Sequence, residues 1–172
     1  MLLTILLGTY LYISFCSECG ASKSDEPPKE AVIPIAPKPT SYPFAFSYGD
    51  YAYNENDNYN FNASSSTILM PLAASMSGSI NSLKSFLSEN PEKVINITGY
   101  YKSDETNDSA FPNLGLARAN AVKNHLAENG IPSARVNTIG LLMDTMVPDK
   151  GIYLGSIAYG ISGESETVDN DL

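Results

Sequence analysis

VINITGYY (residues 94–101) and LGLARA (residues 114–119) are the two blocks that decide the fold of this chain. The first block is apolar and β-branched at most positions up to its glycine, a pattern that predicts a short strand. The second block opens a helix expected over residues 113–129, and Gly130 suits the left-handed position that follows a helix. A strand, a polar loop and a helix with Arg118 in its first turns therefore form the centre of the expected domain.

Further strand and helix patterns flank these two blocks. Alternating aromatic residues predict a strand at 44–48, and the polar stretch 49–60 predicts a surface loop. Apolar residues at three- and four-residue steps predict a helix that begins near Pro71 and ends at Asn90: Ile68, Leu72, Met76, Ile80, Leu83 and Leu87. Residues 135–139 and 152–161 are expected as further strands. Strands interleaved with two helices predict an α/β or α+β sandwich with both helices on one face of a small sheet.

Two segments of different composition precede this domain. Residues 1–19 open with an almost wholly apolar run, a little shorter than the ~20 residues of a spanning helix and without a preceding basic residue. We interpret it as a hydrophobic signal or membrane anchor; a cleaved signal, an uncleaved anchor and a buried core helix stay open as alternatives. Residues 20–43 are rich in proline and predict an extended linker. The domain is expected over 44–161 and an acidic tail over 162–172.

The two cysteines, Cys16 and Cys19, lie outside the expected domain, so no disulfide framework holds its fold. They are interpreted first as membrane-proximal cysteines that are free, paired or acylated. A lipoprotein cysteine at Cys16 is the second interpretation. Phe15 argues against it, because lipoprotein processing sites call for a small residue immediately before the cysteine. A C-x-x-C redox or metal pair would need a thioredoxin-like context or further ligands, which the sequence lacks.

Charge and motif content narrow the classes of function. A net charge of −9 argues against nucleic-acid partners, because binding to a phosphate backbone relies on clustered Lys and Arg. The chain has no G-x-S-x-G motif, no phosphate-binding loop and no cluster of His and Cys ligands. The single histidine, His125, is expected on the polar side of the second helix as a surface residue. We therefore expect a non-catalytic protein without cofactor or metal.

The two blocks resemble the OmpA-like, peptidoglycan-associated domain. That family ends its strand with a Gly-His-Thr-Asp type motif and opens its helix with Leu-Ser-x-x-Arg-Ala, where this chain has GYYK (99–102) and LGLARA (114–119). The likeness covers roughly residues 44–142 and includes the Gly-Ile-Pro stop at 130–132 and the strand that ends at Gly140. It implies a βαβαβ sandwich with two helices on a small mixed sheet, in a protein of the bacterial cell envelope.

The resemblance also implies a ligand, the zwitterionic end of a meso-diaminopimelate group on the peptidoglycan stem peptide. Such a group requires a cation for its carboxylate, and Arg118 stands at the family's arginine position. It also requires an acceptor for its ammonium. The family's aspartate falls on Lys102, so the acceptor is expected from the following loop, with Asp104 first and Glu105 or Asp108 as alternatives. The expected ligand-binding residues are Arg118, Asp104, Tyr101, Lys102 and Asn113.

Two functions stay open at this point. The first is a membrane-tethered, periplasm-facing module that binds peptidoglycan without catalysis, in a membrane that the sequence does not identify. The second is a degenerate domain of the same fold that binds an envelope protein partner or acts as a spacer. For Arg118 itself, the alternative to a ligand role is an exposed helical arginine in a surface pair. A carboxylate from residues 104–108 facing Arg118 would favour the first function. Under the first function, Arg118→Lys is expected to weaken wall binding and to leave stability nearly unchanged.

Overall fold

The computed structural model describes Tyr10 and residues 37–163, and residues 37–163 belong to a compact unit separate from residues 1–36. The predicted anchor (1–19) with its two cysteines, most of the predicted linker (20–43) and nearly all of the predicted tail (162–172) lie outside the described residues. Within the described part of the chain, no helix is long and apolar enough to cross a membrane.

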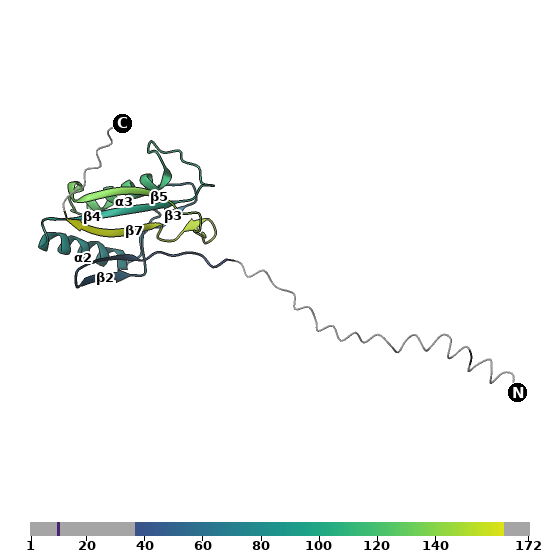
Figure 1. Ribbon diagram of the computed structural model, residues 1–172, viewed down its shortest axis with the longest axis horizontal. Coiled ribbons are helices and arrows are strands. Elements are labelled where there is room, and N and C mark those ends of the chain that lie inside the picture. Colours follow the sequence, from purple (N-terminus) through teal and green to yellow (C-terminus); the bar gives the residue numbers. More distant parts are fainter. Residues whose placement is uncertain (1–9, 11–36, 164–172) are drawn as a thin grey trace. The chain divides into compact units, whose positions relative to one another are not determined.

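A three-stranded sheet is the centre of the domain, and its middle strand contains the first of the two deciding blocks. Strand β4 pairs in parallel with β5 and antiparallel with β7, in the order β5-β4-β7. The elements are β1 (Phe44–Tyr48), β2 (Tyr51–Glu55), β3 (Phe61–Asn62), α2 (Ser75–Glu89), β4 (Lys93–Tyr101), α3 (Leu114–Glu128), the 3-10 helix η2 (Ser133–Arg135), β5 (Val136–Leu142), β6 (Ile152–Tyr153) and β7 (Ile157–Gly163). Two helices with small mixed sheets (Figure 1) confirm the predicted α+β class.

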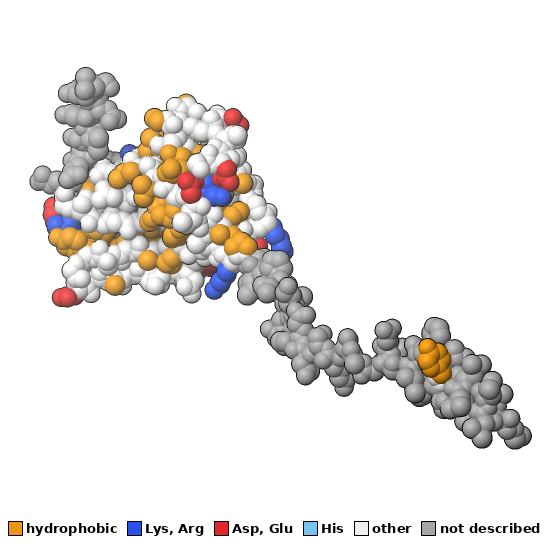
Figure 2. Space-filling view, turned by 45° about the vertical axis from the view of Figure 1, so that its right-hand side comes forward, with side chains coloured by type: hydrophobic (Ala, Val, Ile, Leu, Met, Phe, Trp, Pro, Cys, Tyr) orange, Lys and Arg blue, Asp and Glu red, His pale blue; other side chains and the backbone are white. Residues whose placement is uncertain are grey.

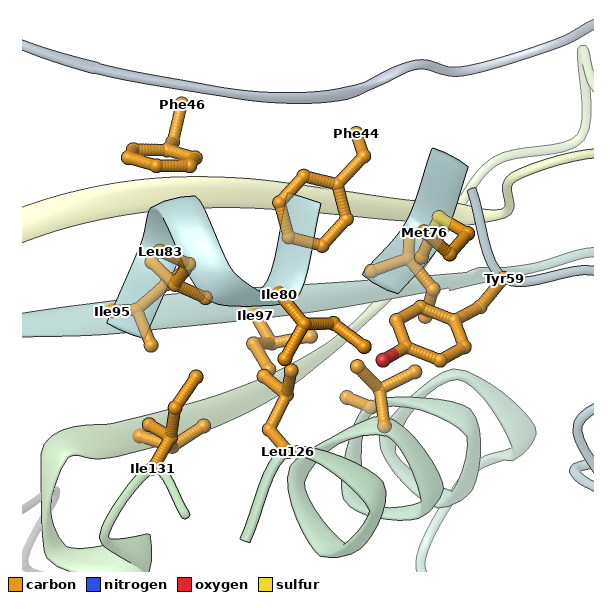
Figure 3. Packing of buried hydrophobic residues seen from close by; sticks show 14 of the residues in the cluster. Phe44, Phe46, Tyr59, Met76, Ile80, Leu83, Ile95, Ile97, Leu126 and Ile131 are labelled. Atoms are coloured by element: carbon orange, nitrogen blue, oxygen red, sulfur yellow. The ribbon is translucent and has the colours of Figure 1, made fainter. Parts of the chain in front are cut away.

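The core lies between one face of this sheet and both helices. Ile95 and Ile97 alternate onto that face of β4, because successive side chains of a strand point to opposite faces. They belong to the same buried cluster as Leu83 of α2 and Leu126 of α3, both of which are fully buried (Figure 3). The burial of Leu83 confirms its place on the apolar helix face that the sequence predicted for α2.

A hairpin of β1 and β2 packs against α2 with its aromatic rings. Phe46 meets Phe86 of α2 edge to face, with ring centroids 5.7 Å apart, and the Tyr53 hydroxyl lies 3.2 Å from Ser79 Oγ. The sequence predicted a loop over 49–60, and this was wrong for β2, which pairs with β1 along its whole length. The polar residues of β2 resemble a loop, and only the contact of its tyrosines with α2 gives the strand an apolar side.

Helix α2 begins within a few residues of Pro71, as the sequence predicted, although part of its apolar pattern lies before the helix. Ile68 and Leu72 precede the first helical residue, Ser75. Ile68 instead forms an isolated bridge with Phe61, and Leu72 packs against the core as part of a non-helical segment. The apolar repeat therefore marks residues that pack against the core, and some of these residues lie in the loop before the helix.

The predicted strand at 152–161 is two strands in two sheets. β6 pairs with β3, whereas β7 pairs with β4. Gly155 lies between them with a φ of 61°, in the left-handed region that glycine adopts without strain. A Cβ at this position would overlap the carbonyl oxygen of Tyr42. This glycine lets the chain leave one sheet and enter the next within a few residues.

The face of the domain in Figure 2 carries few basic side chains, and these stand apart from one another. Apolar groups lie between them, and acidic side chains are scattered over the same face.

Candidate ligand-binding site

Three glycines bring the start of α3 against the ends of β4 and β5. A Cβ on Gly99 would overlap the carbonyl oxygen of Gly115, and a Cβ on Gly115 would overlap that of Gly99. A Cβ on Gly140 would overlap Asn113 Oδ1, which caps the helix by accepting a hydrogen bond from Leu116 N at 2.8 Å. The strand end and the helix start therefore approach each other closely only because these positions lack side chains.

Arg118 lies in the second turn of α3, and its side chain is fully buried (0% exposed). Its Cζ atom is 5.5 Å from the ring centroid of Phe61 and 5.1 Å from that of Tyr153. These two aromatic residues are register partners in the pairing of β3 with β6. The exposed arginine in a surface pair, which the sequence left open as an alternative to a ligand role, is therefore not what the structure contains. A buried cation of this kind requires an anion and complete hydrogen bonding.

Every N–H group of the Arg118 guanidinium has an acceptor within the protein. Two of them donate to the Glu105 carboxylate, with Nη2–Oε1 at 2.6 Å and Nη1–Oε2 at 3.2 Å. The other three donate to the carbonyl oxygens of Asn62 (3.2 Å), Ser65 (3.0 Å) and Tyr100 (2.9 Å). The bidentate arginine–carboxylate geometry is the strong form of this interaction. Arg118 thus connects α3 to β3, to β4 and to the loop between β4 and α3.

Glu105 belongs to the β4–α3 loop (residues 102–113), and its carboxylate is as fully bonded as the guanidinium. Its side chain is 3% exposed. Oε1 also accepts a hydrogen bond from Ser64 N at 2.9 Å, and Oε2 accepts one from Lys102 N at 2.8 Å. The sequence named Glu105 as one of three acidic residues that could face Arg118. The structure places Glu105 there, and Asp104 elsewhere.

Lys102 and Asp104 form a second pair of opposite charges, at the surface. Lys102 Nζ lies 3.1 Å from Asp104 Oδ2, and the two side chains are 20% and 68% exposed. The hydrogen bond to Asp104 raises the pKa of the Lys102 ammonium above its usual value. Nearby, hydrogen bonds from Ser103 N and Oγ lower the pKa of the Asp144 carboxyl. These groups are open to a ligand, whereas the Arg118–Glu105 pair is not.

The comparison with known families concerns the part of the chain that contains both pairs. Residues 60–144 match the model of the OmpA family. This part of the chain is an OmpA-like domain. Domains of this family are typically associated with peptidoglycan, generally bind without catalysis and occur in proteins of the cell envelope. No protein of curated function matches the sequence significantly.

Solved structures similar to this chain include three OmpA-like proteins, each 17% identical to it. They are the OmpA-like domain of FopA1 from Francisella tularensis (66% of this chain and 76% of that chain covered, TM-score 0.41), the peptidoglycan-associated lipoprotein from Burkholderia pseudomallei (62% and 88%, TM-score 0.43) and the C-terminal domain of MotB from Helicobacter pylori (63% and 87%, TM-score 0.43).

A shallow cleft of about 210 Å³ in the OmpA-like domain shares a wall with the buried pair. It is lined by Ser64, Ser65, Ser66, Thr67, Asp108, Ser109 and Leu114. The backbone of Ser64 and Ser65 also bonds Glu105 and Arg118, so the cleft lies directly beside the charged site. Its hydroxyl groups both donate and accept hydrogen bonds, which suits a ligand with hydroxyl or amine groups. Among the described residues, no three His, Cys, Asp or Glu side chains gather in a group that could hold a metal ion.

The other residues singled out from the sequence hold structural positions in the OmpA-like domain. A Cβ on Gly115 would press on the ring of Tyr101, so this ring lies against the first turn of α3. Asn113 uses its side-chain oxygen to cap the same helix. The prediction of a surface position for His125 was wrong, since it is half-buried and its Nδ1 lies 2.9 Å from the Tyr59 hydroxyl. Tyr59 comes from a segment far away in the sequence, so no local pattern indicates this contact.

Proposed function

We propose that this chain is a membrane-tethered, non-catalytic module of the bacterial cell envelope that binds peptidoglycan through a diaminopimelate-type stem peptide. The observation that supports this function best is the exposed pair of Lys102 and Asp104 at the end of β4, 3.1 Å apart. A zwitterionic group needs a cation and an acceptor side by side, and this pair offers both at the surface. Lys102 would attract the ligand carboxylate toward Arg118, and Asp104 would receive its ammonium.

The tether is proposed from composition. The apolar run of residues 1–19 would anchor or export the chain, and the proline-rich residues 20–43 would hold the domain away from the membrane. Fractionation of cells that express the full chain tests this part of the proposal. We expect the intact protein in the membrane fraction or the periplasm, and recovery wholly in the soluble cytoplasm would contradict the tether.

A second function has its own supporting observation. The guanidinium of Arg118 has no N–H group left for a ligand, because its five donors all bond acceptors of the protein. A carboxylate facing Arg118 was expected to favour wall binding, but this one takes part in a complete bonding of the guanidinium. A degenerate OmpA-like domain that binds an envelope protein partner, or that acts as a spacer, would tolerate such an internally closed site. The exposed Lys102–Asp104 pair would then be an ordinary surface ion pair.

Sedimentation with purified peptidoglycan separates the two functions. The full-length protein in detergent is expected to sediment with diaminopimelate-type sacculi, and free meso-diaminopimelate should release it. Sacculi with lysine in place of diaminopimelate lack the second carboxylate and should retain less protein. Lys102→Ala and Asp104→Ala should weaken retention, whereas Asp50→Ala, an exposed acid in the β1–β2 turn, should not. Equal recovery of wild type and both site variants, or no recovery at all, would favour the partner-binding or spacer function.

A further inference from the structure

We infer that the Glu105 carboxylate occupies a carboxylate-binding subsite built around Arg118, so that the chain fills this subsite with its own side chain. In this arrangement Glu105 stands where the carboxylate of an external ligand would otherwise bind. The inference deepens the proposed function, because it assigns the control of ligand access to one named residue.

The surroundings of the Glu105 carboxylate form a complete cradle for such a group. Each oxygen receives one N–H from the guanidinium of Arg118 and one from the backbone, from Ser64 N to Oε1 and from Lys102 N to Oε2. Two parallel bonds from a guanidinium match the geometry of a carboxylate, and two amide donors satisfy its remaining lone pairs. A small carboxylate placed there would find all its acceptor positions matched.

The cradle is held by contacts that do not involve Glu105. The guanidinium donates to the carbonyl oxygens of Asn62, Ser65 and Tyr100, and it lies against the rings of Phe61 and Tyr153. These contacts come from β3, β4, β6 and the segment after β3. They keep the cation in position when its anion is absent, which a subsite requires and an incidental ion pair does not.

Glu105 reaches this cradle from an exposed loop. Its neighbours Asp104 and Thr106 are exposed, although its own side chain is buried. The other bonds that hold this part of the loop to the rest of the domain run from Ser103 to Asp144 and from Thr106 N to Ser64 Oγ, at exposed positions. The carboxylate therefore enters the cradle from the solvent side, next to the hydroxyl-lined cleft.

Displacement of Glu105 is the step that limits access to Arg118. Because Glu105 belongs to the same chain, it competes with an external carboxylate at a high effective concentration. Removal of its carboxylate leaves a buried guanidinium without a counter-charge, which an external carboxylate can restore. The consequence for stem-peptide binding rests on the proposed function, whereas the occupancy itself can be tested with a small carboxylate alone.

Chemical rescue of the full-length protein in detergent provides this test. Glu105→Ala opens the cradle, and Glu105→Gln keeps it filled with a neutral side chain of similar size. Asp50→Ala removes an exposed acid outside the site and serves as the control. Melting temperatures are compared in sodium acetate and in sodium chloride at equal ionic strength. We expect Glu105→Ala to melt below wild type in chloride and to gain about 3–6 °C when acetate reaches about ten times its Kd. Wild type, Glu105→Gln and Asp50→Ala should show no acetate-specific gain.

Two results would overturn the inference. One is the absence of an acetate-specific gain for Glu105→Ala, including its failure to fold in acetate. The other is an equal gain in the Gln variant or in Asp50→Ala, which would reveal a general effect of the salt.

Sedimentation with sacculi then distinguishes this inference from the proposed function. If wild type binds sacculi but acetate does not rescue Glu105→Ala, the proposed function stands and the inference about Glu105 fails. If acetate rescues Glu105→Ala but no variant binds sacculi, the inference stands and the proposed function fails. If both hold, an open state populated at about 10% or less predicts that Glu105→Ala binds a diaminopimelate-containing muropeptide at least about tenfold more tightly than wild type.

Discussion

Arg118 shows how one side chain can serve a fold and a site together. Its position in the helix-opening block matches the arginine of the OmpA-like pattern, which indicates a group that binds carboxylate. In the structure that carboxylate comes from Glu105, and the remaining donors bond three carbonyl oxygens. The same geometry that would recognise a ligand therefore joins four segments of the domain.

Arg118 should consequently contribute much more to stability than its sequence context suggested. Arg118→Ala leaves the Glu105 carboxylate buried without its partner, which is expected to cost about 3–5 kcal/mol. Arg118→Lys keeps the charge but loses the planar fork of the guanidinium. It should therefore lower the free energy of unfolding clearly, though by less than Arg118→Ala. This corrects the expectation of a nearly unchanged stability. Urea unfolding measures both, with Asn124→Ala on an exposed position of the same helix as control. A wild-type midpoint for Arg118→Lys would show that the guanidinium bonds contribute little.

The buried Tyr59 and the partly buried Tyr159 predict a loss of stability at alkaline pH. Burial raises the pKa of Tyr59 and of Tyr159 well above the usual value. In the unfolded chain both phenols ionise near pH 10, about their ordinary value. The folded state therefore holds protons that the unfolded state releases, so stability is complete below about pH 10 and falls as the pH rises further.

Urea midpoints measured from pH 8 to pH 11 check this dependence. Tyr59→Phe should reduce the alkaline fall, and the exposed Tyr51 provides the control substitution to Phe. A midpoint for wild type that stays constant across this range would contradict the prediction.

At the scale of elements, the contact between β4 and α3 decides where the site lies. Gly99 and Gly115 allow the strand end and the helix start to meet backbone to backbone, and Gly140 gives room for the capping side chain of Asn113. The site residues of the β4–α3 loop project from this junction. The close approach of the two elements, rather than any side chain alone, brings Arg118 within reach of the end of β4.

A methyl group at this junction should therefore destabilise the domain. Gly99→Ala would overlap the backbone of α3 at two positions, and overpacking of this kind costs about 1–3 kcal/mol. Gly78, inside α2, is the matched control, because a Cβ there meets no atom within 4 Å. Gly78→Ala should stabilise the protein by about 0.5–1 kcal/mol, as alanine is the better helix former. If chemical denaturation ranks the two variants in the opposite order, the close contact is not present.

At the scale of the whole domain, one hydrophobic cluster connects the hairpin, both helices and the central sheet. It contains residues from β1, α2, β4, α3, β5 and β7, all buried together. The loops and the charged site lie at the ends of this body. Because the elements share one core, the described part of the chain from residue 37 onward is expected to unfold in a single cooperative transition.

Truncation in either helix should therefore affect the same transition. Leu83→Ala and Leu126→Ala each remove fully buried methyl groups and should lower the free energy of unfolding by about 2–5 kcal/mol. Fluorescence of the tyrosines and far-UV circular dichroism should report one coincident midpoint for each variant. Separate midpoints, with each leucine affecting only one of them, would show that the helices belong to independent units.

Local patterns in the sequence determined the parts of the structure that depend on neighbouring residues. The strand at β4 and the helix α3 follow from alternation, from helical spacing and from the residues that end each element. Gly130 adopts a φ of 89° and Ile131 N bonds Leu126 O at 3.0 Å, as the stop signal predicted. The OmpA-like resemblance rested on these same blocks, and the family match over residues 60–144 confirms it.

Only the tertiary structure decided which groups meet across long stretches of chain. Glu105, rather than Asp104, faces Arg118, since the fold of the β4–α3 loop selects one of three acidic residues that the sequence does not distinguish. Strand β2 owes its form to α2, and His125 owes its burial to Tyr59, 66 residues away. Such contacts depend on how packed elements approach one another, and local patterns carry no information about that approach. The physical reason is that side-chain spacing is a property of one element, whereas a binding site is a property of several.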